Sequence, residues 1–286
     1  MTPDVAPAAT ATPDRGFFPA RDGLQLYHET WPGRAPVRAT VAILHGYGDH
    51  SGRFQNPINV LTGHGFDVCA FDYRGHGQAG GRRGHVDRFG EYLDDLGRCL
   101  EVARRRTDGS LFILGHSFGG LIAVRYLLEH QQGAKGVILS SPFIGLSLKV
   151  PAYKAAIARA LSRYVPRLTM KNGVNPALLS RDPGVAAAYA RDHFVHHVAT
   201  ARWFTETLAA QDRALADAAR LTLPLLMLLG DADGIAAPER SRTLFERLGS
   251  EDKTLNVYAG GYHELMNDTV KERVLTDVVA WLEKRA

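Results

Sequence analysis

The stretch ILGHSFGGL, residues 113–121, places a serine among glycines at the end of an apolar run. The run reads as a buried strand, and residues 121–130 have the apolar spacing of a helix. Glycines on both sides of His116, Ser117 and Phe118 allow a tight turn in which backbone segments approach closely. We therefore predict a strand, a sharp turn at Ser117 and a helix, in that order.

Apolar runs that end in a turn recur along the chain and read as strands buried on both faces. They cover residues 39–46, 66–72, 110–117, 135–142, 223–231 and 254–261. An earlier stretch, residues 23–31, alternates like a strand with one exposed face. Helix-length segments lie at residues 92–106, 121–130, 238–248 and 269–285. Strands that alternate with helices predict an α/β fold with a mostly parallel, doubly wound sheet.

One long segment, residues 142–220, interrupts this alternation with helical patterns and no strand-like run. It is too long for a loop without structure of its own, so we predict an inserted helical lid. Residues 17–141 and 221–286 would then form the core. Residues 1–16, rich in alanine, proline and threonine, are expected to be a disordered tail.

The composition is that of a soluble globular protein, with 286 residues, 45% of them apolar and 22% charged. No apolar run reaches the roughly 18 residues of a membrane span, and the N-terminus lacks the pattern of a signal peptide. We therefore expect a cytoplasmic protein. Cys69 and Cys99 lie in apolar and helical runs and are expected to be reduced thiols.

Two classes of partner find no support in the sequence. The net charge is +4, but no basic stretch is interleaved with aromatic residues, so we expect no nucleic acid. No cluster has metal-ligand spacing, and the glycine-rich stretches lack a nucleotide-binding pattern, so we expect neither a metal nor another cofactor. The oligomeric state is not indicated.

The residues from Gly115 to Gly119 match the pattern G-x-S-x-G, which marks the strand-to-helix turn of a nucleophilic serine. The pattern alone is weak, and an idle serine in a glycine-rich turn is the alternative. The strand before it and the helix after it favour the nucleophile. We predict that Ser117 attacks an acyl carbonyl.

A nucleophilic serine needs a base, and the base needs a third group to hold it. In sheets of this type the acid and then the histidine follow the serine along the chain. His263 follows the last predicted strand, and the polar loop after residues 223–231 offers Asp231 and Asp233. We predict His263 as the base and favour Asp233 as the acid. Three other histidines fall in the lid, where we expect packing or surface roles: His193, His196 and His197.

Acyl transfer also needs backbone N–H groups that stabilise the developing oxyanion. We expect one from Phe118, which follows the serine, and one from Tyr47, in the loop after the first central strand. His45 could act as a base by residue type, but a role in shaping that loop is favoured. His76 and Asp72 are likewise assigned to turn structure.

Five blocks of the sequence resemble those of monoacylglycerol lipases and bacterial lysophospholipase-like relatives, within the α/β-hydrolases. They are LHGYGDHSGRF, FDYRGHGQAGGRRGH, GHSFGG, GDADGIAAP and DKTLNVYAGGYHELMND, and the similarity runs from about residue 17 to the C-terminus. The resemblance implies an α/β-hydrolase fold. It also implies a catalytic triad and an oxyanion hole at the residues already predicted: Ser117, Asp233, His263, Tyr47 and Phe118.

The family also carries an acid and an arginine near the end of the site that takes the glycerol group. Here they are Asp49 and Arg53, which could instead form an ion pair that shapes the oxyanion loop. Met266 stands where monoacylglycerol lipase has a histidine on the alcohol side. The lid sequence RDHFVHH also departs from the usual Asp-Pro-Leu version.

We therefore predict a lidded serine hydrolase that cleaves carboxylic esters of single-chain lipids, with monoacylglycerols as the first candidates. A lysophospholipase or a short-chain carboxylesterase would use the same triad. More distant alternatives are a peptidase or acyltransferase on this fold, and a binding protein without catalysis. The full set of serine, acid and histidine argues against the last.

The first half of the lid is basic and has no acidic residue between positions 142 and 181. Its cations are Lys149, Lys154, Arg159, Arg163, Arg167, Lys171 and Arg181. An apolar stripe recurs there at helical spacing: Val150, Tyr153, Ile157, Ala160, Leu161 and Tyr164. Either this stripe packs on the core, or it enters a lipid surface while the cations meet anionic headgroups. The second interpretation predicts transient peripheral contact with a membrane.

Overall fold

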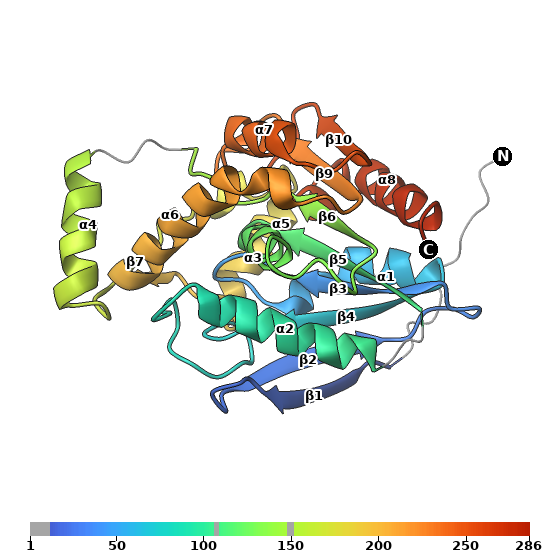
Figure 1. Ribbon diagram of the computed structural model, residues 1–286, viewed down its shortest axis with the longest axis horizontal. Coiled ribbons are helices and arrows are strands. Elements are labelled where there is room, and N and C mark those ends of the chain that lie inside the picture. Colours follow the sequence, from blue (N-terminus) through green and yellow to red (C-terminus); the bar gives the residue numbers. More distant parts are fainter. Residues whose placement is uncertain (1–11, 106–108, 148–151) are drawn as a thin grey trace.

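A computed structural model describes residues 12–105, 109–147 and 152–286 (Figure 1). Eight strands form one sheet in the order β1-β2-β4-β3-β5-β6-β9-β10. They are β1 (Asp14–Pro19), β2 (Gln25–Trp31), β3 (Ala39–Leu44), β4 (Phe66–Asp72), β5 (Ser110–His116), β6 (Gly136–Ser140), β9 (Leu225–Gly230) and β10 (Lys253–Tyr258). Within this sheet of the described residues, the pairs β1–β2 and β2–β4 are antiparallel and the other pairs are parallel. The predicted α/β class with a mostly parallel sheet is confirmed.

The central strands are continuous apolar runs because both faces of the sheet are covered. All six residues of β3 are buried. Ala42 and Leu44 pack into the hydrophobic cluster on one face, whereas Val41 and Ile43 pack into the cluster on the other. Successive side chains of a strand point to opposite faces, so an apolar residue is needed at every position.

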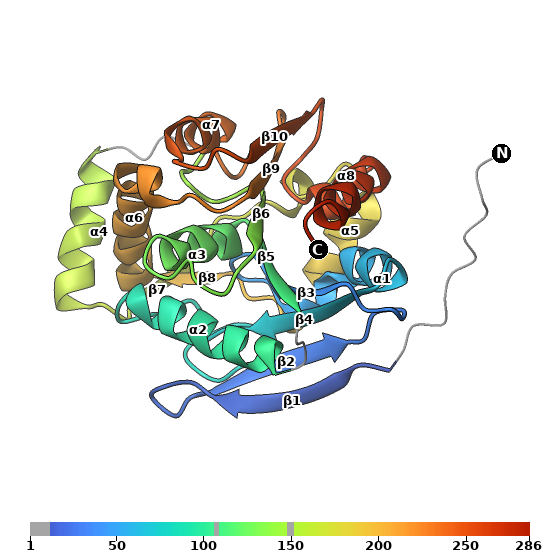
Figure 2. The ribbon, with the colours of Figure 1, turned by 45° about the vertical axis from the view of Figure 1, so that its right-hand side comes forward.

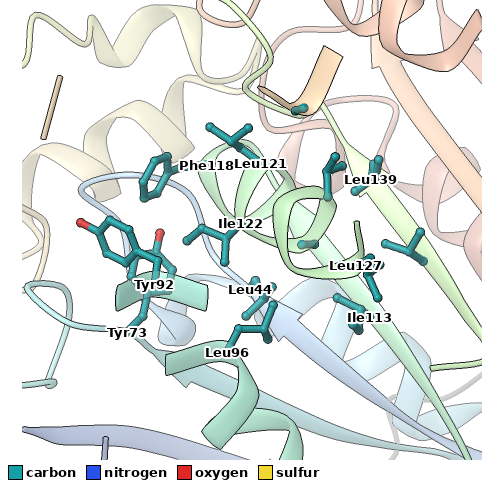
Figure 3. Close-up of a cluster of buried hydrophobic side chains, with 14 of the residues drawn as sticks. Leu44, Tyr73, Tyr92, Leu96, Ile113, Phe118, Leu121, Ile122, Leu127 and Leu139 are labelled. Atoms are coloured by element: carbon teal, nitrogen blue, oxygen red, sulfur yellow. The ribbon is translucent and has the colours of Figure 1, made fainter. Parts of the chain in front are cut away.

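Helices cover the two faces in separate layers (Figure 2). Helices α2 (Gly90–Arg104), α3 (Phe118–Leu127) and α7 (Pro238–Arg247) pack on one face. Helices α1 (Gln55–Gly63) and α8 (Lys271–Glu283) pack on the other. Figure 3 shows Phe118, Leu121 and Ile122 of α3 pointing into the first cluster. This packing holds α3, and the turn before it, rigidly against the sheet.

Between β6 and β9 lies the segment predicted as a lid. It holds α4 (Ala152–Tyr164), α5 (Pro183–Arg191) and α6 (Ala201–Ala216), and α4 runs beside α6 at one end of the molecule (Figures 1 and 2). It also contains the short antiparallel strands β7 (Thr169–Lys171) and β8 (Val198–Thr200), so the prediction that it has no strand was wrong. Three-residue strands are too short to leave an apolar alternation in the sequence. Lys149, Val150 and Pro151 lie outside the described residues.

Four short 3₁₀ helices complete the described elements. They are η1 (Ser51–Arg53), η2 (Pro176–Leu178), η3 (Ala218–Arg220) and η4 (Leu265–Asn267). No helix in the described parts of the chain combines the length and apolar character that crossing a membrane requires.

The start of the sheet corrects two expectations. Strand β1 begins at Asp14 and pairs with β2, so residues 14–16 belong to the sheet and not to a disordered tail. Strand β2 is largely buried instead of half-exposed, because it lies between β1 and β4. Residues 1–11 of the predicted tail lie outside the described residues.

Candidate active site

Ser117 occupies the sharp turn between β5 and α3. Its backbone torsions, φ of 52° and ψ of −115°, lie in a region that residues other than glycine rarely adopt. The surroundings impose this conformation. The Ser117 N–H donates to the carbonyl of Ser140 at 2.9 Å, and its own carbonyl accepts from Leu121 at 3.2 Å and from Phe143 at 3.0 Å. Strained backbone that is held in this way is common at functional sites.

The two outer glycines of the motif are required by close backbone contacts. A Cβ atom on Gly119 would lie 2.6 Å from the carbonyl oxygen of His45. A Cβ atom on Gly115 would lie 2.7 Å from the carbonyl oxygen of Gly119. Neither position can carry a side chain without moving the backbone, so both glycines serve the geometry of the turn.

Ser117, His263 and Asp233 form one hydrogen-bonded series. Nε2 of His263 lies 2.9 Å from Oγ of Ser117, and Nδ1 lies 2.7 Å from Oδ2 of Asp233. Oδ1 of Asp233 accepts from the backbone N–H groups of Ile235 at 2.8 Å and Ala236 at 3.0 Å. A carboxylate can only accept, so Nδ1 carries the imidazole proton and Nε2 is left to accept from the serine hydroxyl.

Electrostatics stabilise a protonated His263. Burial alone would lower the pKa of His263, but the carboxylate of Asp233 outweighs it, and the pKa is raised. Burial would raise the pKa of Asp233, yet the His263 charge and hydrogen bonds to the carboxylate lower it. The Asp233 carboxylate therefore stabilises the imidazolium form of His263, which suits a histidine that takes a proton during the reaction.

Asp231, the alternative acid, has another partner. Its Oδ1 accepts from the backbone N–H of Gly260 at 2.6 Å, and the side chain is exposed. This bond joins the ends of β9 and β10. Of the two candidates, Asp233 is the one that bonds His263.

The two predicted oxyanion donors belong to Phe118, which follows Ser117, and to Tyr47, in a loop at the same cavity. Tyr47 lines the same cavity as Ser117, and the N–H of Gly119 donates to the His45 carbonyl at 3.1 Å, which ties the Tyr47 loop to α3. Within the described residues, neither the Tyr47 N–H nor the Phe118 N–H has a hydrogen-bond partner. Both donors are therefore free for a ligand atom.

The side chain of Tyr47 anchors the lid segment to the core. Its hydroxyl donates to the carbonyl of Val198 at 2.7 Å, and its ring stacks on Trp203 with centroids 3.7 Å apart. The N–H of His196 also donates to the carbonyl of Gly48 at 3.0 Å. The loop that carries the Tyr47 N–H is thus held by contacts of the Tyr47 side chain and of the Gly48 backbone with the lid segment.

The residues assigned to loop structure have loop partners. Nδ1 of His45 lies 2.7 Å from the Gly46 carbonyl, and Nδ1 of His76 lies 3.0 Å from the Arg74 carbonyl. Asp72 accepts from the backbone N–H groups of Ser51 at 2.7 Å and Gln78 at 2.8 Å. None of these side chains bonds Ser117.

A cavity of about 550 Å³ opens at Ser117 and His263. Much of its lining is apolar and comes from the lid segment and the loop after β6: Phe143, Leu146, Leu161, Trp203, Phe204 and Leu208. A polar part is lined by Asp49, Arg53, Tyr189 and Glu264. A cavity of this size and lining can hold an apolar chain together with a small polar group.

The polar part contains more than the sequence suggested. The predicted Arg53–Asp49 pair is present at 3.1 Å, but Arg53 also binds Glu264 through two bonds of 2.9 Å. Its guanidinium carbon lies 4.8 Å from the ring centre of Tyr189. In the sequence, the only indication that Glu264 belongs to the site is its position next to His263. Nothing in the sequence indicates that Tyr189 does. Met266 packs in the core and is absent from the cavity lining given by the described residues.

The described residues contain no group of three or more His, Cys, Asp or Glu side chains arranged to hold a metal ion. The polar side chains that line the cavity carry carboxylate, guanidinium, ammonium, imidazole, amide and hydroxyl groups.

The sheet order, the strained serine turn and the histidine that returns to it after the last strand define an α/β-hydrolase. A family model described as "Serine aminopeptidase, S33" matches residues 35–270, and the chain belongs to this family of hydrolases.

Known proteins resemble the chain over most of its length. A monoacylglycerol lipase from Mycolicibacterium smegmatis is 32% identical over 96% of this chain and 98% of its own. The crystal structure of a monoacylglycerol lipase from Paleococcus ferrophilus superimposes with a TM-score of 0.84 at 37% identity, covering 91% of this chain and 99% of that one. An uncharacterized abhydrolase domain-containing protein of Dictyostelium discoideum is 34% identical over 90% of this chain, which spans only 27% of its length.

Proposed function

We propose that the chain hydrolyses carboxylic esters of single-chain lipids, with monoacylglycerols as the favoured substrates. The observation that carries the proposal is the hydrogen-bonded series Ser117–His263–Asp233 at a cavity whose lining is largely apolar and includes a cluster of buried charged side chains. An acyl chain fits the apolar part and a small hydroxylated alcohol fits the polar part. The relatives named monoacylglycerol lipases support the same substrate class.

The reaction begins when Oγ of Ser117 attacks the acyl carbonyl and Nε2 of His263 takes the hydroxyl proton. The negative charge passes to the former carbonyl oxygen, where the N–H groups of Tyr47 and Phe118 stabilise it. His263 then gives its proton to the leaving alcohol oxygen, and the acyl chain remains on Ser117 as an ester. Water adds to that ester by the same route and releases the fatty acid.

Asp233 keeps His263 in the productive tautomer. Its carboxylate accepts from Nδ1 at 2.7 Å and stabilises the imidazolium that forms in each half of the reaction. The backbone N–H groups of Ile235 and Ala236 hold the other carboxylate oxygen, so the acid has little freedom to turn away.

Asp49 and Arg53 are assigned to the alcohol end of the site. Both line the cavity that contains Ser117, and both are largely buried. Arg53 also lies in η1, directly after the loop that carries Tyr47, so the ion pair shapes the oxyanion loop as well. The two roles expected from the sequence are compatible in this geometry.

Transient contact with a membrane is the second part of the proposal. Tyr153, Ile157 and Tyr164 of α4 are 63%, 54% and 76% exposed, so these three side chains of the apolar stripe face away from the core. Val165, Leu168 and Met170 extend this apolar surface, while Arg159, Arg163, Arg167 and Lys171 are exposed beside it. Ile157 and Met170 also line the cavity, which connects this surface to the site. A lipid substrate could pass from a membrane directly toward Ser117.

A hydrolysis panel on one preparation tests the proposal. Monoacylglycerols, lysophospholipids and p-nitrophenyl esters of graded chain length are compared by kcat/KM, with Ser117→Ala as the control. We expect the highest kcat/KM for monoacylglycerols and no turnover by the variant. Hydrolysis of short-chain p-nitrophenyl esters alone would contradict the lipid assignment, and no hydrolysis of any ester would favour a binding protein.

A further inference from the structure

The polar part of the cavity holds one cation between two anions. The two guanidinium nitrogens Nη1 and Nη2 of Arg53 each bond one carboxylate oxygen of Glu264 at 2.9 Å. Nη1 also bonds Oδ1 of Asp49 at 3.1 Å. The side chains of Arg53, Asp49 and Glu264 are only 10%, 7% and 5% exposed.

The geometry favours an ionised Glu264. Its two oxygens accept from Arg53, and one of them accepts from Nδ2 of Asn267 at 3.0 Å. Each of these partners is a donor, so a protonated carboxyl would find no acceptor among them. Burial would raise the pKa of Asp49, but Arg53 outweighs it and the pKa is lowered. Two carboxylates against one guanidinium leave a formal charge of −1.

Among the described residues, Arg53 is the lysine or arginine that pairs with these two carboxylates, and His263, whose pKa they help to raise, is bonded to Asp233. Burial and the neighbouring His263 lower the pKa of His116 to about 3, so its ring is neutral at ordinary pH. His50 is paired with Asp192 of the lid segment at 2.8 Å. Among the described residues that line the cavity, the other lysine or arginine is Lys171, which is exposed on β7.

A phosphate group would therefore meet two obstacles at this end of the cavity. Its charge would be repelled by the net −1 in a region of low dielectric. Arginine binds phosphate best through two parallel N–H bonds, and here Glu264 already occupies that pair of donors. An uncharged alcohol meets neither obstacle, because its hydroxyl groups can donate to carboxylate oxygens.

We propose that Glu264 is a specificity-determining residue that makes the alcohol end accept uncharged alcohols and disfavour esters whose alcohol carries a phosphate. This rests on the proposed function and deepens it, because it separates monoacylglycerols from lysophospholipids. A residue that only held the oxyanion loop would affect both classes of ester alike.

The test compares two esters with the same acyl chain, 1-oleoylglycerol and 1-oleoylglycerol 3-phosphate, in neutral detergent micelles. The quantity measured is the ratio of kcat/KM for the uncharged ester to that for the phosphate ester. Glu264→Gln keeps the size of the side chain and removes the charge, and it should lower this ratio about tenfold, or about 1.4 kcal/mol. Asp49→Asn removes the same charge from a different residue and should lower the ratio in the same direction.

Asp192→Asn is the matched control, because Asp192 also binds a neighbouring side chain of the Asp49 loop but does not line the cavity. The ratio of kcat/KM for the two esters should stay close to the wild-type value in this control variant. The proposal would be overturned if Glu264→Gln lowered kcat/KM equally for both esters. It would also be overturned if Asp192→Asn changed the ratio of kcat/KM as much as Glu264→Gln does. If the wild type cleaves neither ester, the proposed function itself fails, and the proposal with it.

Discussion

Nε2 of His263 lies 2.9 Å from Oγ of Ser117, although the two residues are 146 positions apart in the chain. Ser117 follows β5 and His263 follows β10, and two strands lie between these in the sheet. The loop after β10 closes the gap by folding over the end of β9, where the N–H of Ala232 donates to the Gly261 carbonyl at 3.1 Å. A Cβ atom on Gly230 would collide with Gly261, so the close approach depends on glycine there.

The two candidate acids can be separated by charge-neutral substitutions. Asp233→Asn should lower kcat about 10⁴-fold, because an amide can hold the imidazole in the wrong tautomer. Asp231→Asn should lower kcat far less, since the Asp231 side chain bonds only the turn at Gly260 in the described structure. Steady-state kinetics on one monoacylglycerol measure both. A larger loss at Asp231 would reverse the assignment.

The pH dependence of kcat/KM reports the charge of His263 in the free enzyme. The base must be neutral, and Asp233 outweighs burial to raise the pKa of His263 above its ordinary value. Activity should therefore fall as the pH drops through this raised pKa. In Asp233→Asn the carboxylate is gone and burial remains, so the acid limb should move to lower pH. An acid limb that stays in place or moves to higher pH would show that Asp233 does not act on His263 in this way.

The strained backbone of Ser117 predicts a difference in stability between two inactive variants. A φ of 52° is strained for alanine or serine but not for glycine. The strain costs about 1–3 kcal/mol, and glycine loses about 0.5–1 kcal/mol through chain entropy. Ser117→Gly should therefore be more stable than Ser117→Ala by about 1 kcal/mol in urea unfolding. Lower stability of the glycine variant would mean that the turn is not strained in solution.

Contact of the lid with a membrane can be measured by vesicle co-sedimentation. Binding should be stronger to vesicles with anionic lipid than to neutral ones, and high salt should weaken it, because each cation near an anionic surface contributes about 1 kcal/mol. Changing Arg159, Arg163 and Arg167 to glutamine should remove most of the preference for anionic vesicles. All three side chains are exposed on or near α4.

A control variant removes the same number of cations elsewhere. Arg34, Arg273 and Lys284 are exposed and lie outside the lid segment, with α8 far from α4 (Figure 1). Changing them to glutamine should leave vesicle binding nearly unchanged. If both triple variants lose binding equally, net charge explains the effect and the lid has no special role.

The central part of the fold could be predicted because its signals are local. Strands β3 and β5 are continuous apolar runs, and the turn at Ser117 carries two glycines that its contacts require. Strands β1, β7 and β8 were missed. Each is formed by pairing with a neighbouring strand, and a short edge strand needs no apolar pattern of its own.

The site could be predicted only where a motif or chain order marked a residue. The structure brings Ser117, Asp233 and His263 together, while their catalytic roles stay predictions. Glu264 and Tyr189 were not predicted, because they meet Arg53 only through tertiary packing. The sequence also could not predict which way helix α4 of the lid faces, since the spacing of an apolar stripe is the same whether it faces the core or solvent.

Labelling with a fluorophosphonate, followed by intact mass and peptide mapping, tests the central claim most directly. The reagent phosphonylates a serine that a neighbouring base has activated, so the wild type should gain one adduct, at Ser117, and lose its esterase activity in proportion. Ser117→Ala should gain no adduct, and its kcat should fall on the order of 10⁶-fold. An adduct on the alanine variant, or esterase activity that survives the substitution, would contradict the assignment of Ser117 as the nucleophile.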